Sequence, residues 1–227
     1  MNVSTPREPD LIQRAWPINE QPMARLFAHG PAALSDAEIL AVLLRKGSKD
    51  KSAVEVARDA LSQTGGILGL MANPNPLQRE AYARILAASE LMRRALREQL
   101  SQTSALSSPL AVRDYLRLAL SGKEHEVFVV VLLDAQHRVL ATEELFRGTL
   151  TQTSVYPREV VKTALRHNAA AVIFAHNHPS GVAEPSTADE LLTRTLKSAL
   201  ALVDIRVLDH FVIAGSAALS FAERGLI

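Results

Sequence analysis

The amino-acid sequence predicts an α/β (α+β) protein, in which a small all-helical N-terminal domain precedes a domain built on a mixed sheet. Two observations predict this class. Between residues 23 and 100, apolar residues recur at the three- and four-residue spacing of amphipathic helices. Beyond residue 110, uninterrupted β-branched and aliphatic runs alternate with helical patterns. Such alternation is typical of a sheet with helices between its strands.

The N-terminal part is expected to begin with a loose arm over residues 1–22, which hold four of the eleven prolines and show no sustained periodicity. Ser35 and Glu38 form a capping-box pattern that predicts the start of a helix. Two more helices are expected over Ser52–Leu61 and Gln78–Leu100.

The Ser/Thr-rich residues 101–109 have the composition of a linker. Residues 110–227 are expected to form the second domain, in which Val127–Leu133 is apolar enough for a strand covered on both faces. The remaining expected elements are a helix over Ala111–Leu120, a turn over Asp134–His137, a strand over Arg138–Phe146, a helix from Pro157, a strand over Ala169–Ala175, a helix from Ser186, and short strands over Ile205–Val207 and Phe211–Ile213.

The composition of the 227 residues excludes several classes of protein. There is no cysteine, which excludes a disulfide scaffold, a thiol nucleophile and Cys-ligated zinc or iron–sulfur centres. The net charge of +1 gives no general attraction to nucleic acid or acidic membranes. The N-terminus lacks a signal-peptide core, and the longest apolar runs are far shorter than the roughly 20 residues of a membrane span. We therefore expect a cytoplasmic protein without a membrane segment.

The most informative segment is His176-Asn177-His178-Pro179, at the end of a buried apolar run. Side chains two residues apart on a strand point to the same face, so both imidazoles can converge on one point. Asp189 lies in the first turn of the next expected helix and can complete the set. Two imidazoles and one carboxylate form a standard catalytic zinc set with an open position for water.

Each part of this pattern also has an ordinary explanation. Seven histidines in a chain of this length give about 0.2 chance His-x-His pairs. Ser186-x-x-Asp189 is also a common way to cap a helix. Only the combination of the two at this short spacing favours a metal site.

The combined pattern resembles the JAMM motif of MPN/JAB-type metalloproteases. The wider set of motifs is similar to the bacterial RadC family, also known as DUF2466. The motifs that carry the resemblance are Phe146-Arg-Gly148-Thr149-Leu150, Pro157-Arg158-Glu159-Val160, His176–Gly181, and Leu208-Asp209-His210. The N-terminal helices are similar to the family's N-terminal domain through Leu34–Leu40 and the helix containing Ser89–Arg94.

The resemblance implies an MPN/JAB-like (cytidine-deaminase-like) fold for residues 110–227. It also implies one Zn²⁺ per chain, with His176, His178 and Asp189 as ligands. Ser186 would hydrogen-bond the metal-bound water or the developing oxyanion. The implied activity is a zinc metalloprotease that hydrolyses an amide bond of an unknown peptide or protein. The alternative is a non-catalytic accessory protein in DNA repair or replication-linked processes.

The general base is left open, because no glutamate lies between the two histidines. The family resemblance favours Glu126, directly before the strand at Val127, since the MPN fold places its catalytic glutamate there. Glu143, Glu144 and Glu159 are the alternatives.

Binding of nucleic acid is possible but not favoured by the sequence. In the RadC family the N-terminal domain resembles a helix–hairpin–helix unit, whose Gly-x-Gly turn would present amides to a phosphate. The corresponding stretch here, Pro74–Ala81, has no Gly-x-Gly and contains Glu80. Arg79, Arg84, Arg93, Arg94 and Arg97 are the remaining candidate phosphate contacts.

Two further histidines lie near these motifs. For His210 we expect a structural hydrogen bond with Asp209 between two short strands. For His125, beside Glu126, we expect an exposed loop position or a contact behind the metal ligands.

Overall fold

The computed structural model describes residues 21–73, 77–102, 104–105, 109–120, 122–148 and 155–227. The chain forms two compact units, which divide after Ala88. The predicted arm lies almost entirely outside the described residues, as do Pro74–Pro76 and part of the predicted linker. No helix in the described ranges is both long and apolar enough to cross a membrane.

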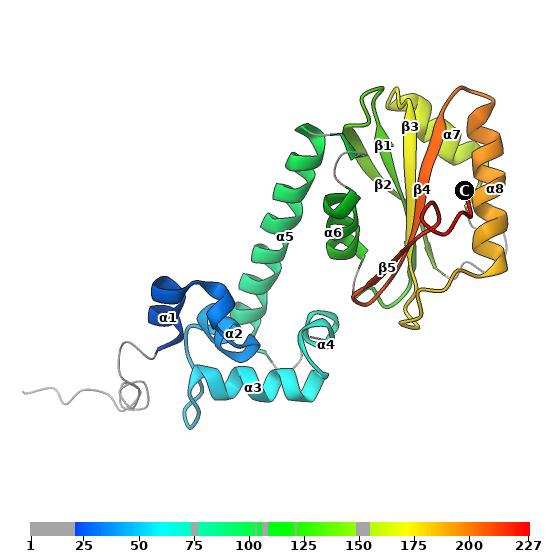
Figure 1. The fold of residues 1–227 in the computed structure, drawn as a ribbon. Coiled ribbons are helices and arrows are strands. Elements are labelled where there is room, and N and C mark those ends of the chain that lie inside the picture. The colour runs from blue at the N-terminus through cyan, green and yellow to red at the C-terminus, as the bar shows by residue number, and fades with distance from the viewer. Residues whose placement is uncertain (1–20, 74–76, 103, 106–108, 121, 149–154) are drawn as a thin grey trace, which may run out of the picture. The chain divides into compact units, whose positions relative to one another are not determined.

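The N-terminal unit is helical, as predicted (Figure 1). Ser35 and Ser52 each cap a helix through a complete capping box. The serine hydroxyl oxygen accepts from the third N–H of the helix, and the glutamate carboxylate at that third position accepts from the serine backbone N–H. Leu40, Leu44 and Ala57 belong to the unit's core. Its elements are α1 (Pro22–His29), the 3₁₀ helix η4 (Pro31–Ala33), α2 (Asp36–Leu44), α3 (Ala53–Thr64), α4 (Ile67–Ala72) and the first part of α5 (Arg79–Gln102).

Helix α4 was not predicted. Gly65, with a φ of 74°, ends α3 in the left-handed conformation. The chain then re-enters a helix after only one further glycine, Gly66, and α4 lasts six residues. A helix this short shows no clear period in the sequence.

The C-terminal unit contains a five-stranded mixed sheet in the order β2-β1-β3-β4-β5 (Figure 1). Strands β3 and β4 are parallel, and the other neighbouring pairs are antiparallel. The elements are α6 (Pro109–Leu120), β1 (Glu126–Leu133), β2 (Val139–Gly148), α7 (Pro157–Arg166), β3 (Ala171–Asn177), α8 (Thr187–Ala201), β4 (Arg206–Ala214) and β5 (Ala217–Ser220). The predicted mixed sheet is therefore confirmed.

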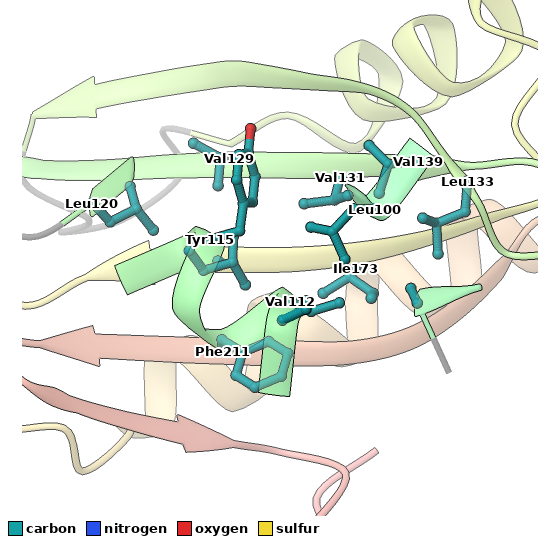
Figure 2. Close-up of a cluster of buried hydrophobic side chains, with 14 of the residues drawn as sticks. Leu100, Val112, Tyr115, Leu120, Val129, Val131, Leu133, Val139, Ile173 and Phe211 are labelled. Carbon is teal, nitrogen blue, oxygen red and sulfur yellow. The ribbon is translucent and has the colours of Figure 1, made fainter. Parts of the chain in front are cut away.

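The two faces of β1 contribute to different cores, as expected for a strand covered on both sides. Val127, Val129, Val131 and Leu133 belong to the core that includes Val112, Tyr115 and Leu116 of α6, and Figure 2 shows Val129, Val131 and Leu133 in this core. Phe128, Val130 and Leu132 face the opposite way, toward the core that includes Val160 of α7 and Leu196 of α8. The sheet thus lies between helical layers, and residues of even number on β1 face α7 and α8.

Three predictions for this unit need correction. Strand β4 is continuous over Arg206–Ala214. Two short strands were predicted there because Asp209 and His210 interrupt the apolar pattern of the sequence. Both polar side chains have partners inside the protein: Asp209 accepts from the hydroxyl of Ser220. Strand β3 begins and ends two residues later than predicted, and β5 was not predicted. Ser101 and Gln102 of the predicted linker complete α5, and the domain boundaries themselves stay a prediction.

Replacing Leu116 with alanine should lower the free energy of unfolding by about 2–5 kcal/mol, because its fully buried side chain leaves a cavity between α6 and the sheet. Leu110→Ala is the matched control on the same helix, since Leu110 is 71% exposed. It should change stability by no more than about 0.5 kcal/mol. Urea denaturation of the full chain measures both values, and equal losses would contradict this assignment of the core.

Candidate metal centre

The first two polar groups of the site come from the end of β3. His176 is fully buried and lies on the face of the sheet that packs against α7 and α8, opposite Phe128 of β1. His178 follows the last residue of the strand, and its backbone N–H donates to the carbonyl of Ile213 on β4. Gly181, at a φ of 80°, then allows the tight turn that was expected there. The two imidazole rings converge, with their Nε2 atoms 3.0 Å apart.

The carboxylate comes from the first turn of α8. Ser186 is the N-cap, and Asp189 completes the capping box. Asp189 Oδ2 accepts from the backbone N–H of Ser186 at 2.7 Å and from its hydroxyl at 2.6 Å. Asp189 Oδ1 lies 3.3 Å from Nε2 of His176. The hydrogen bonds that cap the helix therefore also fix the orientation of this carboxylate.

The three side chains offer ligand atoms within 4.8 Å of one another, so they could hold a metal ion. The donor set fits a cation. His178 Nδ1 lies 2.8 Å from the carbonyl oxygen of Val182, which can only accept, so in the neutral ring the proton is on Nδ1 and the lone pair on Nε2. A nitrogen lone pair pointing at a second imidazole nitrogen at 3.0 Å is favourable only with a proton or a cation between them.

Burial and charge set the protonation of these groups. Burial lowers the pKa of His176 to about 4, so this imidazole is neutral at pH 7. Burial opposes ionisation of Asp189, but the hydrogen bond from His178 and the contacts with His176 and Ser186 hold the pKa of the carboxyl below its usual range. The Asp189 carboxylate raises the pKa of His178, and the charge of Glu126 acts in the same direction.

The four candidate bases differ in their surroundings. Glu126 begins β1 and by the alternation of the strand shares the face of Phe128 and His176. Its charge acts on His178, as described above. The others have partners elsewhere: Glu143 contacts His167 at 3.2 Å, and ion pairs join Glu144 to Lys123 at 3.2 Å and Glu159 to Lys162 at 3.1 Å. The charge of Glu126 is thus among the main influences on the pKa of His178.

Asn177, between the two histidines, connects β3 to the residues on either side of Glu126. Its Oδ1 accepts from the backbone N–H of Val127 at 2.8 Å, and its Nδ2 donates to the carbonyl of His125 at 3.0 Å. The side chain is 4% exposed. It continues the link between β1 and β3 beyond the last paired residues, Phe128 and His176. No local sequence pattern predicted these contacts of Asn177.

His210 is placed differently from the sequence expectation. It lies inside β4 and is fully buried. Asp209 accepts from the backbone N–H of His210, and the imidazole instead contacts His176 and Thr193. The family motif pointed to His210, but no local pattern pointed to Thr193. The two partners of the His210 ring, Thr193 and His176, lie 17 and 34 residues away in sequence. His125 contacts Arg147.

Two family models match the chain, and together they cover most of its length. Residues 106–226 match the RadC-like JAB domain, and residues 13–79 match the UPF0758 N-terminal domain. A UPF0758 protein of Nitrosospira multiformis is 58% identical over 219 residues, which cover 93% of this chain and 98% of the relative. UPF0758 proteins of Dechloromonas aromatica and Thiobacillus denitrificans are 58% and 60% identical over 221 and 220 residues, with the same coverage. The resemblance predicted from the motifs is confirmed.

Replacing Asn177 with alanine should destabilise the protein by about 1–3 kcal/mol, because it removes the partners of buried backbone groups at Val127 and His125. The amide hydrogen of Val127 should exchange faster with solvent, and hydrogen exchange measured by NMR tests this directly. Gln136→Ala, in the exposed turn before β2, is the control and should leave that rate unchanged. Unaltered exchange at Val127 in the Asn177 variant would contradict the assigned contact.

Proposed function

The chain belongs to the RadC-like JAB domain family, and we propose that its C-terminal domain is a zinc-dependent hydrolase that cleaves an amide bond in a peptide or protein. The observation that carries this proposal is the convergence of His176, His178 and Asp189, with Glu126 close enough to act electrostatically on His178. JAB-type domains are similar to metalloproteases of the JAMM group, which agrees with this arrangement.

The ligand set favours zinc over the harder divalent cations. Imidazole nitrogens suit zinc, whereas magnesium and calcium prefer sites built from oxygen ligands. His176, His178 and Asp189 would hold the ion and would leave it able to bind a water molecule, as three protein ligands commonly do in catalytic zinc sites. Bound there, zinc would supply a Lewis acid that lowers the pKa of water to about 7 and polarises a carbonyl.

Residues of the chain itself would transfer the proton and hold the ligands in place. Glu126 is proposed as the general base that takes a proton from the attacking water and returns it to the leaving amine. Asn177 holds the backbone on both sides of Glu126 and so fixes the position of this carboxylate relative to β3. His178 is held by Val182 and His176 by His210, so neither ring needs to reorient when the site is used.

Ser186 is assigned a different contribution from the one expected. Its hydroxyl donates to Asp189 Oδ2 at 2.6 Å, so we propose that Ser186 orients the ligand carboxylate. A role in stabilising an oxyanion requires this hydroxyl to turn away from Asp189, and that role stays a prediction.

For the partner we propose a peptide or protein rather than a nucleic acid. Three of the five arginines that could contact phosphate already have partners within the chain. Arg84 donates to the carbonyls of Leu43 and Leu44 at the end of α2. Arg93 and Arg94 both pair with Glu90. These contacts occupy guanidinium groups that a phosphate would need.

Purified protein prepared without chelators should contain about one zinc ion per chain. His178→Ala and Asp189→Ala should lose it, because each removes a ligand atom. His29→Ala is the control, since this histidine lies in the last turn of α1, and its zinc content should equal that of the wild type. Elemental analysis measures the ratio, and a metal-free wild type that also fails to take up added zinc would contradict the proposal.

Glu126→Gln should retain zinc and lose hydrolysis by a factor of roughly 10²–10⁴, because glutamine cannot accept the proton. Glu159→Gln is the control, since Glu159 pairs with Lys162 on α7 and should be dispensable. Turnover can be followed by mass spectrometry on a pool of synthetic peptides, with loss of cleavage on chelation as the criterion for metal dependence. Wild-type turnover in the Glu126 variant would exclude it as the base.

A further inference from the structure

We propose that Thr193 and His210 are positioning residues that hold His176 in the tautomer with its proton on Nδ1 and its lone pair on Nε2, facing His178 and Asp189. The inference deepens the proposed metal site, and it rests on that proposal only in taking His176 as a ligand. It does not depend on the bond that the protein cleaves.

Three hydrogen bonds link these residues in a row. His176 Nδ1 lies 2.8 Å from His210 Nε2, and His210 Nδ1 lies 2.6 Å from Thr193 Oγ1. Thr193 Oγ1 in turn lies 2.6 Å from the backbone carbonyl oxygen of Asp189. His176, His210 and Thr193 are at most 1% exposed, so water does not compete for these contacts. The row begins at one candidate ligand and ends at the backbone of another.

The carbonyl of Asp189 decides the direction of all three bonds. A carbonyl oxygen accepts hydrogen bonds and cannot donate one. The single hydroxyl proton of Thr193 must therefore point to it, and Thr193 Oγ1 then accepts from Nδ1–H of His210. With its proton on Nδ1, His210 offers Nε2 as an acceptor to Nδ1–H of His176. The lone pair of His176 is left on Nε2.

The opposite direction is unfavourable for a specific reason. If Thr193 donated to His210, its oxygen would lie 2.6 Å from the carbonyl oxygen of Asp189 with no proton between them. His210 would then donate to Nδ1 of His176 and move the proton of that ring to Nε2. That nitrogen could no longer bind a metal without losing its proton first.

The surroundings of His210 favour a neutral ring with one proton. Phe221, Phe128 and Phe174 lie around it, with ring centroids 4.7, 5.5 and 5.9 Å away. An imidazolium with no carboxylate in direct contact is costly in such an apolar environment. The ring nitrogens of His210 are used by His176 and Thr193, so one proton satisfies both contacts.

The same tautomer of His178 is set by a single hydrogen bond. Its Nδ1 lies 2.8 Å from the carbonyl oxygen of Val182, which fixes its proton directly. A backbone carbonyl therefore sets the tautomer of each candidate histidine ligand: that of Val182 for His178, and that of Asp189, through two side chains, for His176. Ligand histidines in metal sites commonly donate their second N–H in this way.

The first experiment reads the tautomer in the metal-free wild-type protein, where no substitution can disturb folding. Long-range ¹H–¹⁵N NMR of histidine-labelled protein at pH 7.5 distinguishes a protonated from an unprotonated ring nitrogen. We expect His176 and His210 each to carry the proton on Nδ1. A proton on Nε2 of His176 would overturn the proposal.

The second experiment measures the affinity for Zn²⁺ alone by competition with a chromophoric chelator. Thr193→Val keeps the shape of the side chain but removes the acceptor for His210, and it should weaken zinc binding by about 10–100-fold. Thr193→Ser restores the hydroxyl and should bind nearly as well as the wild type. Thr195→Val is the matched control, because Thr195 also donates to the carbonyl four residues earlier on α8 but contacts neither histidine.

The outcomes separate this inference from the proposed function. If the wild type binds zinc and Thr193→Val binds it equally tightly with an unchanged tautomer, the positioning role is wrong while the metal site stands. If the wild type binds no zinc, the proposed function fails, and the tautomer in the metal-free protein still decides the present proposal. Equal losses in Thr193→Val and Thr195→Val would also overturn it, since a general effect on α8 would then explain them.

Discussion

The central strand β3 carries two polar side chains, His176 and Asn177, to a depth where water does not reach, and a buried polar group there needs a partner inside the protein. The neighbouring elements are arranged to supply those partners. Strand β4 brings His210 to Nδ1 of His176, and the start of β1 presents backbone groups to the amide of Asn177. The candidate site and the pairing of the central strands therefore depend on the same hydrogen bonds.

Ordinary helix capping supplies the third part of the site. The capping box of Ser186 and Asp189 satisfies N–H groups that are free at the start of any helix. Because one carboxylate oxygen is used by Ser186, the other is directed toward His176. One turn later, Thr193 of the same helix contacts His210, which in turn contacts Nδ1 of His176. A short stretch of α8 thus contributes to the site through its cap, a carboxylate, a hydroxyl and a carbonyl.

Local sequence patterns predicted the strands and helix starts that are determined by residues close together in the sequence. The apolar run from Val127 to Leu133 indicated a strand covered on both faces, and Ser186 with Asp189 indicated a helix start; both are present. The fold class and the family followed from such patterns and from the motifs around His176. The interior of β4 could not be predicted, because Asp209 and His210 are tolerated there only through contacts with β5, β3 and α8. Likewise, no local signal relates Asn177 to the backbone of Val127, which lies 50 residues earlier.

Because side chains alternate along β3, the register of this strand decides whether His176 and Asn177 reach their partners. On a strand, a shift of one residue in register exchanges the two faces. A slipped β3 would turn the imidazole of His176 toward α6 and the amide of Asn177 toward α8, so the hydrogen bonds of His176 with His210 and of Asn177 with Val127 and His125 would be lost together. Because both faces of β3 are apolar, these polar contacts distinguish the correct register of the strand from a shifted one.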